Sequence, residues 1–233
     1  MKELIGVGIY SIPEAAALTG IESRKIRRWL FDGPKQPGTL VGANALWTPE
    51  LADADVGDNI SFHDLLEVRF VDAFRQHGVS LQSIRAAAAH AKEFFASPYP
   101  FTCQKFLTDG RSIFADTLEE TGDESLMDLV KKQYVFKQIV SHSLYAGIEY
   151  NDNQLAARWF PIPRSRKVVL DPSRAFGKPI LHDYGITTEA LYSSWQAEDS
   201  SIKRVSDLFE IPKDLVEAAI NFEQRIAANE VLH

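Results

Sequence analysis

The sequence predicts a mainly α-helical fold with small β elements, an α+β class. First, apolar residues recur at helical spacing behind capping residues within 11–30, 61–95 and 187–226. Second, short β-prone runs bounded by Gly, Pro or Asn lie between these segments. Third, 233 residues with 45% hydrophobic content can bury a real core, which suits two or three small domains.

Residues 11–30 predict two short helices broken at Thr19-Gly20. Ser11 is a suitable N-cap, and Pro13 lies where a first helical turn tolerates proline. In the second helix, three apolar residues at i, i+3 and i+4 share one face: Ile26, Trp29 and Leu30.

The opposite face of that second helix is basic. Its polar and cationic residues are Ser23, Arg24, Lys25, Arg27 and Arg28. A helix, a tight turn and a second helix with a basic face are typical of a helix-turn-helix, whose second helix fits the DNA major groove. A solvated helix surface is the simpler alternative, but here every charge of the run is positive in an acidic protein.

The net charge of −7 argues against nucleic-acid binding over the whole protein surface. Residues 1–48 carry six Lys and Arg against four Asp and Glu, a balance of +2, which leaves −9 for the rest. This distribution favours local DNA contact by the N-terminal part and a protein partner for the acidic remainder.

The stretch after the basic helix predicts a small hairpin. Thr39 to Val41 and Ala45 to Trp47 flank a turn at 42–44, where a winged helix-turn-helix carries its wing. An acidic connector follows at 49–58. Ser61 with Asp64 then predicts a capping box opening a helix to about His77, and Ser80 predicts the cap of the next helix.

Residues 8–95 resemble the DNA-binding domain of MerR-type regulators, including the phrase Gly-Val-Ser-Leu-Gln-Ser-Ile at 78–84. The resemblance implies a winged helix-turn-helix domain over 1–97. Two features depart from the family. No long coiled-coil helix follows, and the segment 39–47 contains no Arg or Lys, which leaves Lys35 as the nearest basic candidate for phosphate contact.

Residues 98–161 predict a small α+β insert. Runs at 102–107 and 112–117 flank Asp109-Gly110, which predicts a hairpin, and a helix is expected from 126 to about 144. Two further strands are expected at 148–150 and 157–160.

Residues 162–233 predict a third domain, in which β-prone residues precede three helices. The helices are expected to start at 187 or 188, behind Ser200, and at Pro212. Its Asp-Pro and Gly-Lys-Pro phrases followed by three helices resemble a short bacterial domain of unknown function, homeodomain-like in outline. That domain is common in VapB-like antitoxins whose operon partners are PIN-like ribonuclease toxins.

The third predicted helix exposes Asp214, Glu217 and Glu223, which would repel DNA phosphates. We therefore expect this domain to bind a partner or a second copy rather than DNA. The candidate residues for that contact are Trp195, Lys203, Arg204, Phe209 and Phe222.

No enzyme, metal or cofactor site is predicted. The six histidines show no metal-ligand spacing, and no nucleophile or phosphate loop stands out. The single Cys103 excludes an internal disulfide and any cysteine-based zinc cluster, which suits the cytoplasm. No apolar run suggests a membrane span or a signal peptide.

The leading hypothesis is a homodimeric, DNA-binding antitoxin that represses its own operon and holds a PIN-like toxin. A MerR-like transcription regulator that senses a small ligand in the insert, without a toxin partner, is the alternative. A third possibility is an adaptor whose helix-turn-helix is only a packing unit.

Overall fold

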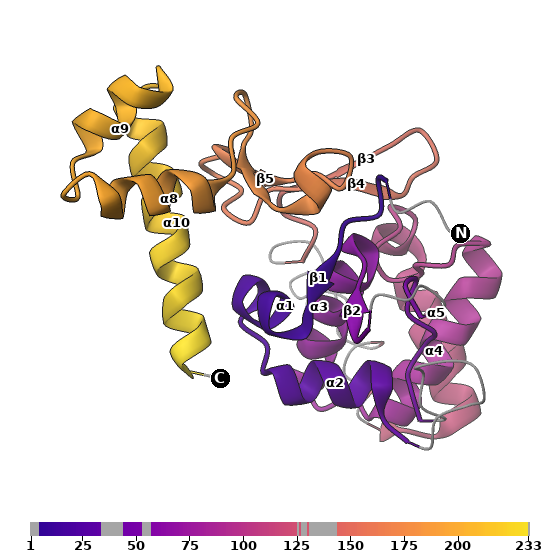
Figure 1. Cartoon of the computed structure of the whole chain (residues 1–233). Coiled ribbons are helices and arrows are strands. Elements are labelled where there is room, and N and C mark those ends of the chain that lie inside the picture. The colour runs from indigo at the N-terminus through magenta and orange to yellow at the C-terminus, as the bar shows by residue number, and fades with distance from the viewer. Residues whose placement is uncertain are drawn as a thin grey trace.

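The computed structural model describes residues 5–33, 44–52, 57–124, 126, 130 and 144–232. The predicted wing strand at 39–41, Lys35 and most of the helix expected from 126 to 144 lie outside these residues. Figure 1 shows the N-terminal helices gathered on one side and the last helices on the other, with strands between them.

The N-terminal part begins with β1 (Tyr10–Ser11), α1 (Ile12–Thr19) and α2 (Ser23–Phe31). β1 pairs antiparallel with β2 (Asn59–Ile60), which leads into α3 (Phe62–Gln76) and α4 (Leu81–Phe95). The sequence prediction of both later caps is confirmed: Ser61 forms a capping box with Asp64, and the Ser80 side chain accepts from the Ser83 N–H.

The predicted hairpin around Asp109-Gly110 is wrong, because the segment forms α5 (Phe106–Thr121). Phe106, Ile113, Phe114 and Thr117 lie at helical spacing and are all buried. Burying these side chains in one core outweighs the local turn preference of Asp-Gly.

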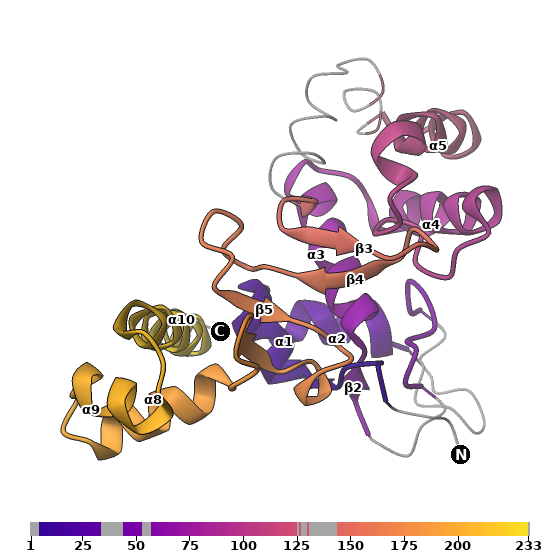
Figure 2. The ribbon, with the colours of Figure 1, turned by 90° about the horizontal axis from the view of Figure 1, so that it is seen from above.

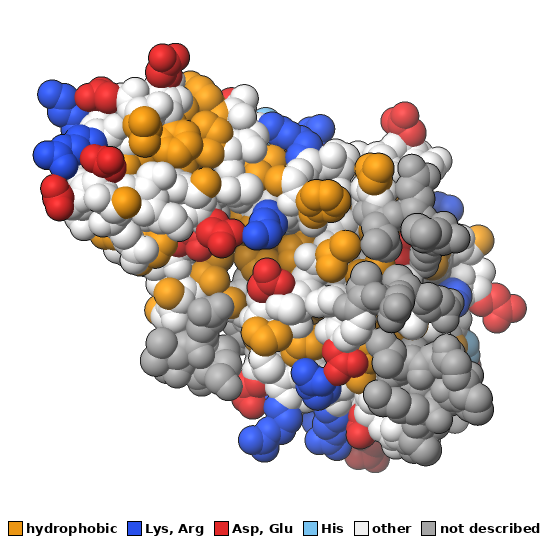
Figure 3. Space-filling model, viewed as in Figure 1, with side chains coloured by type: hydrophobic (Ala, Val, Ile, Leu, Met, Phe, Trp, Pro, Cys, Tyr) orange, Lys and Arg blue, Asp and Glu red, His pale blue; other side chains and the backbone are white. Residues whose placement is uncertain are grey.

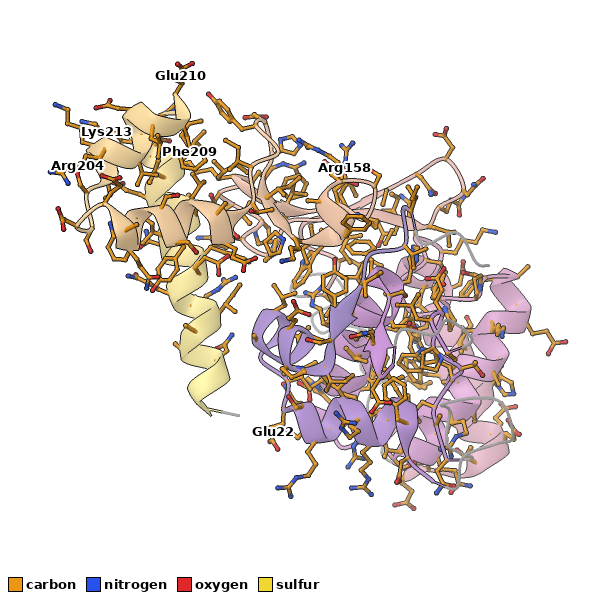
Figure 4. All side chains as sticks on the ribbon, in the orientation of Figure 1. Glu22, Arg158, Arg204, Phe209, Glu210 and Lys213 are labelled. Carbon is orange, nitrogen blue, oxygen red and sulfur yellow. The ribbon has the colours of Figure 1, made fainter. Side chains whose placement is uncertain are left out.

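An antiparallel sheet follows in chain order: β3 (Ile148–Tyr150), β4 (Ala156–Trp159), β5 (Val168–Leu170) and β6 (Pro179–Leu181). The two strands predicted near 148–150 and 157–160 are confirmed as β3 and β4. The guanidinium of Arg158 in β4, labelled in Figure 4, donates to the buried Asp171 carboxylate just after β5, with Nε and Oδ2 3.0 Å apart.

A short 3-10 turn (η2, Ala175–Gly177) precedes β6, and three helices complete the chain: α8 (Thr188–Ala197), α9 (Ile202–Phe209) and α10 (Lys213–Leu232). The N-cap of α9 is Ser201 rather than Ser200, which lies in the preceding turn with φ +60°. On α9, Val205 is buried, whereas Leu208 is 64% exposed.

Two main hydrophobic clusters hold these elements together. The larger one joins residues from Tyr10 to Leu170 and contains a ring cluster around Phe106, which makes edge or tilted contacts with Phe70, Phe74, Phe95, Phe101 and Phe114. The second is built mainly on α8, α9 and α10. Figure 2 shows the sheet extending from beside α3 and α4 toward these helices. Mainly helical elements with small sheets confirm the predicted fold class.

The first and last helices of the chain touch. α10 packs on α1, where the Asn229 Nδ2 donates to the Ala17 carbonyl at 3.0 Å, and Leu18 packs against the C-terminal cluster. The Tyr10 hydroxyl donates to the Gly177 carbonyl at 2.6 Å. The position of α1 is therefore fixed partly by the C-terminal residues.

Candidate nucleic-acid interface

The turn between α1 and α2 sets the direction of the second helix. Ser11 and Glu14 form a reciprocal capping box at the start of α1, with the Ser11 N–H 2.8 Å from the Glu14 Oε2. Gly20 ends α1 with φ +73°, a conformation that favours glycine, and its N–H donates to the Ala16 carbonyl at 2.8 Å. The predicted break at Thr19-Gly20 is confirmed.

The inner face of α2 is fully packed. Ile26 and Leu30 have no exposed surface, and Trp29 is 4% exposed, as the apolar spacing predicted. The Leu46 N–H donates to the Trp29 carbonyl at 2.7 Å, so the second half of the predicted wing segment also holds the C-terminal end of this helix. α2 is thereby held as a rigid element with one face left to solvent.

The outer face of α2 presents the predicted cations. Arg24, Lys25, Arg27 and Arg28 are exposed, and Ser23 at the N-terminal end is half-buried. Figure 3 shows Lys and Arg side chains gathered over α2 at the lower edge of the molecule. Positive charge on one exposed helix face is the electrostatic pattern that phosphate binding requires.

Two of these cations already have carboxylate partners. Lys25 pairs with Glu22, with Nζ and Oε1 3.1 Å apart, and Figure 4 shows Glu22 near the N-terminal end of α2. Arg27 pairs with Asp58. By contrast, Arg24 and Arg28 make no ion pair with any residue that the structure describes. They lie one turn apart on the same helix face, so they are the cations most available to an anion.

A cleft that the sequence did not predict opens beside α2. It has a volume of about 370 Å³ and is lined by Lys25 and Arg28 from α2 and by Asp72, Arg75 and Gln76 of α3, with Trp29 and Leu81 completing the lining. Arg75 is held in place because its guanidinium donates to the Val79 carbonyl at 2.5 Å. Only folding brings α3 beside α2, so no local pattern in the sequence indicates this neighbour.

The expected wing is described only in part. Ala45 to Trp47 is irregular, with a bend at Leu46 and Trp47, rather than a strand, while Lys35 and residues 39–43 of the predicted hairpin lie outside the described residues.

The residues predicted for partner binding differ in how exposed they are. Lys203 and Arg204 on α9 are exposed, and Arg204 pairs with Asp199, with Nη1 and Oδ2 2.9 Å apart. Trp195 is half-buried, and so is Phe209, which Figure 4 shows beside Glu210. Phe222 is only 1% exposed and packs in the C-terminal cluster, so its side chain is unavailable to a partner in this conformation.

Two carboxylates of α10 are engaged within the chain, whereas Glu217 is exposed. Asp214 pairs with Lys167, with Oδ2 and Nζ 2.8 Å apart, and Glu223 accepts from the Thr188 hydroxyl. Within the described residues, no cluster of His, Cys, Asp or Glu is arranged to hold a metal ion. No described helix is both long and apolar enough to cross a membrane.

No protein-family model matches the sequence. The chain is similar to a Mycobacterium tuberculosis (strain ATCC 25618 / H37Rv) protein named "Putative antitoxin VapB45", with 25% identity over 225 residues, covering 92% of this chain and 93% of the relative. A crystal structure of Rv2018 from M. tuberculosis is also similar, with a TM-score of 0.67 and 24% identity over 94% of this chain and 99% of that one. The chain therefore shares its overall fold with that solved structure.

Proposed function

We propose that this protein is an antitoxin of a type II toxin-antitoxin system, which represses its own operon by inserting α2 into the DNA major groove. The similarity along nearly the whole chain to a protein named as an antitoxin supports the antitoxin role. The observation that carries the DNA proposal is the exposed basic face of α2, with Arg24 and Arg28 unpaired among the described residues.

The chemistry of α2 fits base recognition. A guanidinium can donate two parallel hydrogen bonds to guanine O6 and N7, which contributes roughly 1–3 kcal/mol of base discrimination. Lys25 and Arg27 would first have to leave Glu22 and Asp58, so they suit phosphate contact better than base reading. Two-fold symmetric operators imply that the chain binds as a homodimer.

The toxin partner is proposed to be a PIN-like ribonuclease held by the C-terminal helices. Half-buried Phe209 and exposed Leu208 lie on α9 beside Lys203 and Arg204, and Figure 3 shows hydrophobic side chains rimmed by charged ones over this part of the molecule. An apolar centre with a charged rim is the usual composition of a protein interface.

Two double variants test the DNA contact and the toxin contact separately. Arg24→Ala with Arg28→Ala is expected to weaken binding to the protein's own promoter by at least about tenfold, while the neighbouring toxin still co-purifies. Lys203→Glu with Leu208→Asp is expected to lose the toxin and keep operator binding. If the first pair binds its promoter as tightly as wild type, α2 is not the reading helix.

A further inference from the structure

A cavity open to solvent on one side lies outside both proposed interfaces. It has a volume of about 510 Å³ and is lined by the segment 46–50, by one face of α4 and by the turn at 98–100, with Glu67 of α3 among its lining residues. That volume falls in the range of pockets that hold small organic ligands.

The walls of this cavity are flat and rigid. The Trp47 indole is fixed because its Nε1 donates to the buried Asp64 carboxylate at 2.7 Å. Tyr99 stacks on His63, with ring centroids 4.2 Å apart and planes 14° from parallel. Three prolines at 49, 98 and 100 complete the lining and restrict its backbone. A site built from fixed aromatic rings suits a planar ligand.

Two cations of α4 line the same cavity. Arg85 and Lys92, two helical turns apart, are exposed and make no ion pair with any described residue. The Arg85 guanidinium donates to the Asn44 carbonyl at 2.7 Å, which holds its charge at the edge of the cavity. Guanidinium and ammonium groups without a carboxylate partner favour an anion.

Both acidic residues of the lining lie against protein groups. Glu67 accepts from the Thr102 N–H and hydroxyl, both at 2.8 Å, and burial raises its pKa to about 8, so it is largely uncharged at neutral pH. Glu50 lies against His63, with Oε2 and Nδ1 3.6 Å apart. With one charged carboxylate and two cations, the lining has a positive balance.

We propose that this cavity binds a small aromatic anion, with its ring against Trp47 and Tyr99 and its acid group on Arg85 and Lys92. The ligand would also contact the segment whose Leu46 N–H donates to the Trp29 carbonyl, so it would share a structural element with α2.

Calorimetric titration with 2-naphthoate tests the site, and the assay needs neither DNA nor toxin. One molecule is expected to bind per chain, with the dissociation constant raised at least tenfold by Arg85→Ala with Lys92→Ala. Ala89→Phe, at an exposed position of the lining, is expected to fill the cavity. It should also raise the dissociation constant at least tenfold. Gln82→Phe, exposed on the same helix but outside the lining, and Arg164→Ala are the matched controls and should leave binding unchanged.

A second titration tests whether the cavity prefers an anion over a cation. 2-Naphthylmethylammonium, of similar shape but opposite charge, is expected to bind at least tenfold more weakly than the naphthoate. The proposal is overturned if the naphthoate does not bind, if the ammonium binds equally well, or if a folded Ala89→Phe variant retains full affinity. Because operator and toxin binding are measured separately, failure here leaves the proposed antitoxin role intact.

Discussion

Glu67 should make the free energy of unfolding depend on pH. Its side chain is 1% exposed, and burial raises its pKa from 4.5 to about 8. The folded protein therefore holds a proton that the unfolded chain releases near pH 4.5. This contribution to stability is fully present below pH 4.5 and is lost as pH rises toward and through about 8.

The size of this pH effect on the free energy of unfolding follows from the raised pKa of Glu67. One pKa unit corresponds to about 1.4 kcal/mol, so raising pH from 5.5 to 8.5 should remove on the order of 3 kcal/mol through this one group. Glu67→Gln cannot ionise and should not show this loss. Its amide nitrogen would face the Phe101 N–H, a donor now 3.3 Å from the Glu67 Oε2, which adds a pH-independent cost of roughly 1 kcal/mol.

Urea unfolding of wild type and Glu67→Gln at pH 5.5, 7.0 and 8.5 measures the effect. The variant should gain on wild type by about 3 kcal/mol between the lowest and highest pH. Glu93→Gln, an exposed position on α4, should track wild type throughout. A constant difference between wild type and Glu67→Gln at all three pH values would show that Glu67 is ionised in the folded protein.

Four further changes test the packing and a helix cap. Phe106→Ala should lower the free energy of unfolding by about 3–5 kcal/mol in urea melts, because its fully buried ring joins the aromatic cluster. Gly110→Ala should lower Tm despite the better helix propensity of alanine, since its Cβ would lie 2.8 Å from the Phe106 ring. At Gly177, φ is +83° and an added Cβ would lie too close to the Tyr10 hydroxyl, so Gly177→Ala should speed proteolysis near the N-terminus. Ser61→Ala removes a helix cap and should lower the free energy of unfolding by about 1 kcal/mol without faster proteolysis there.

Local signals in the sequence predicted much of α1, α2 and the turn between them. Ser11, Gly20 and Ser61 act through hydrogen bonds or backbone angles within a few residues, so their roles can be read from neighbouring positions. The apolar and basic faces of α2 likewise follow from helical spacing alone.

Features that depend on tertiary contact were not predictable in this way. The Asp109-Gly110 pair favours a turn, but the buried rings of Phe106 and Phe114 stabilise a helix through it. Pairing of Arg27 with Asp58 joins residues 31 positions apart, so the sequence could not separate the paired cations from Arg24 and Arg28. The cavity beside Glu67 combines four separate segments and has no local signature.

The contact between Asn229 and Ala17 has a consequence for synthesis. The two residues are 212 positions apart, so at about 5–20 residues per second roughly 10–40 s separate their appearance on the ribosome. During that interval α1 lacks the helix against which it packs, and Leu18 has no C-terminal cluster to contact. Until α10 is synthesised, the surface of α1 that packs on it stays exposed. Chaperones and proteases can therefore reach a surface of α1 that the complete protein buries.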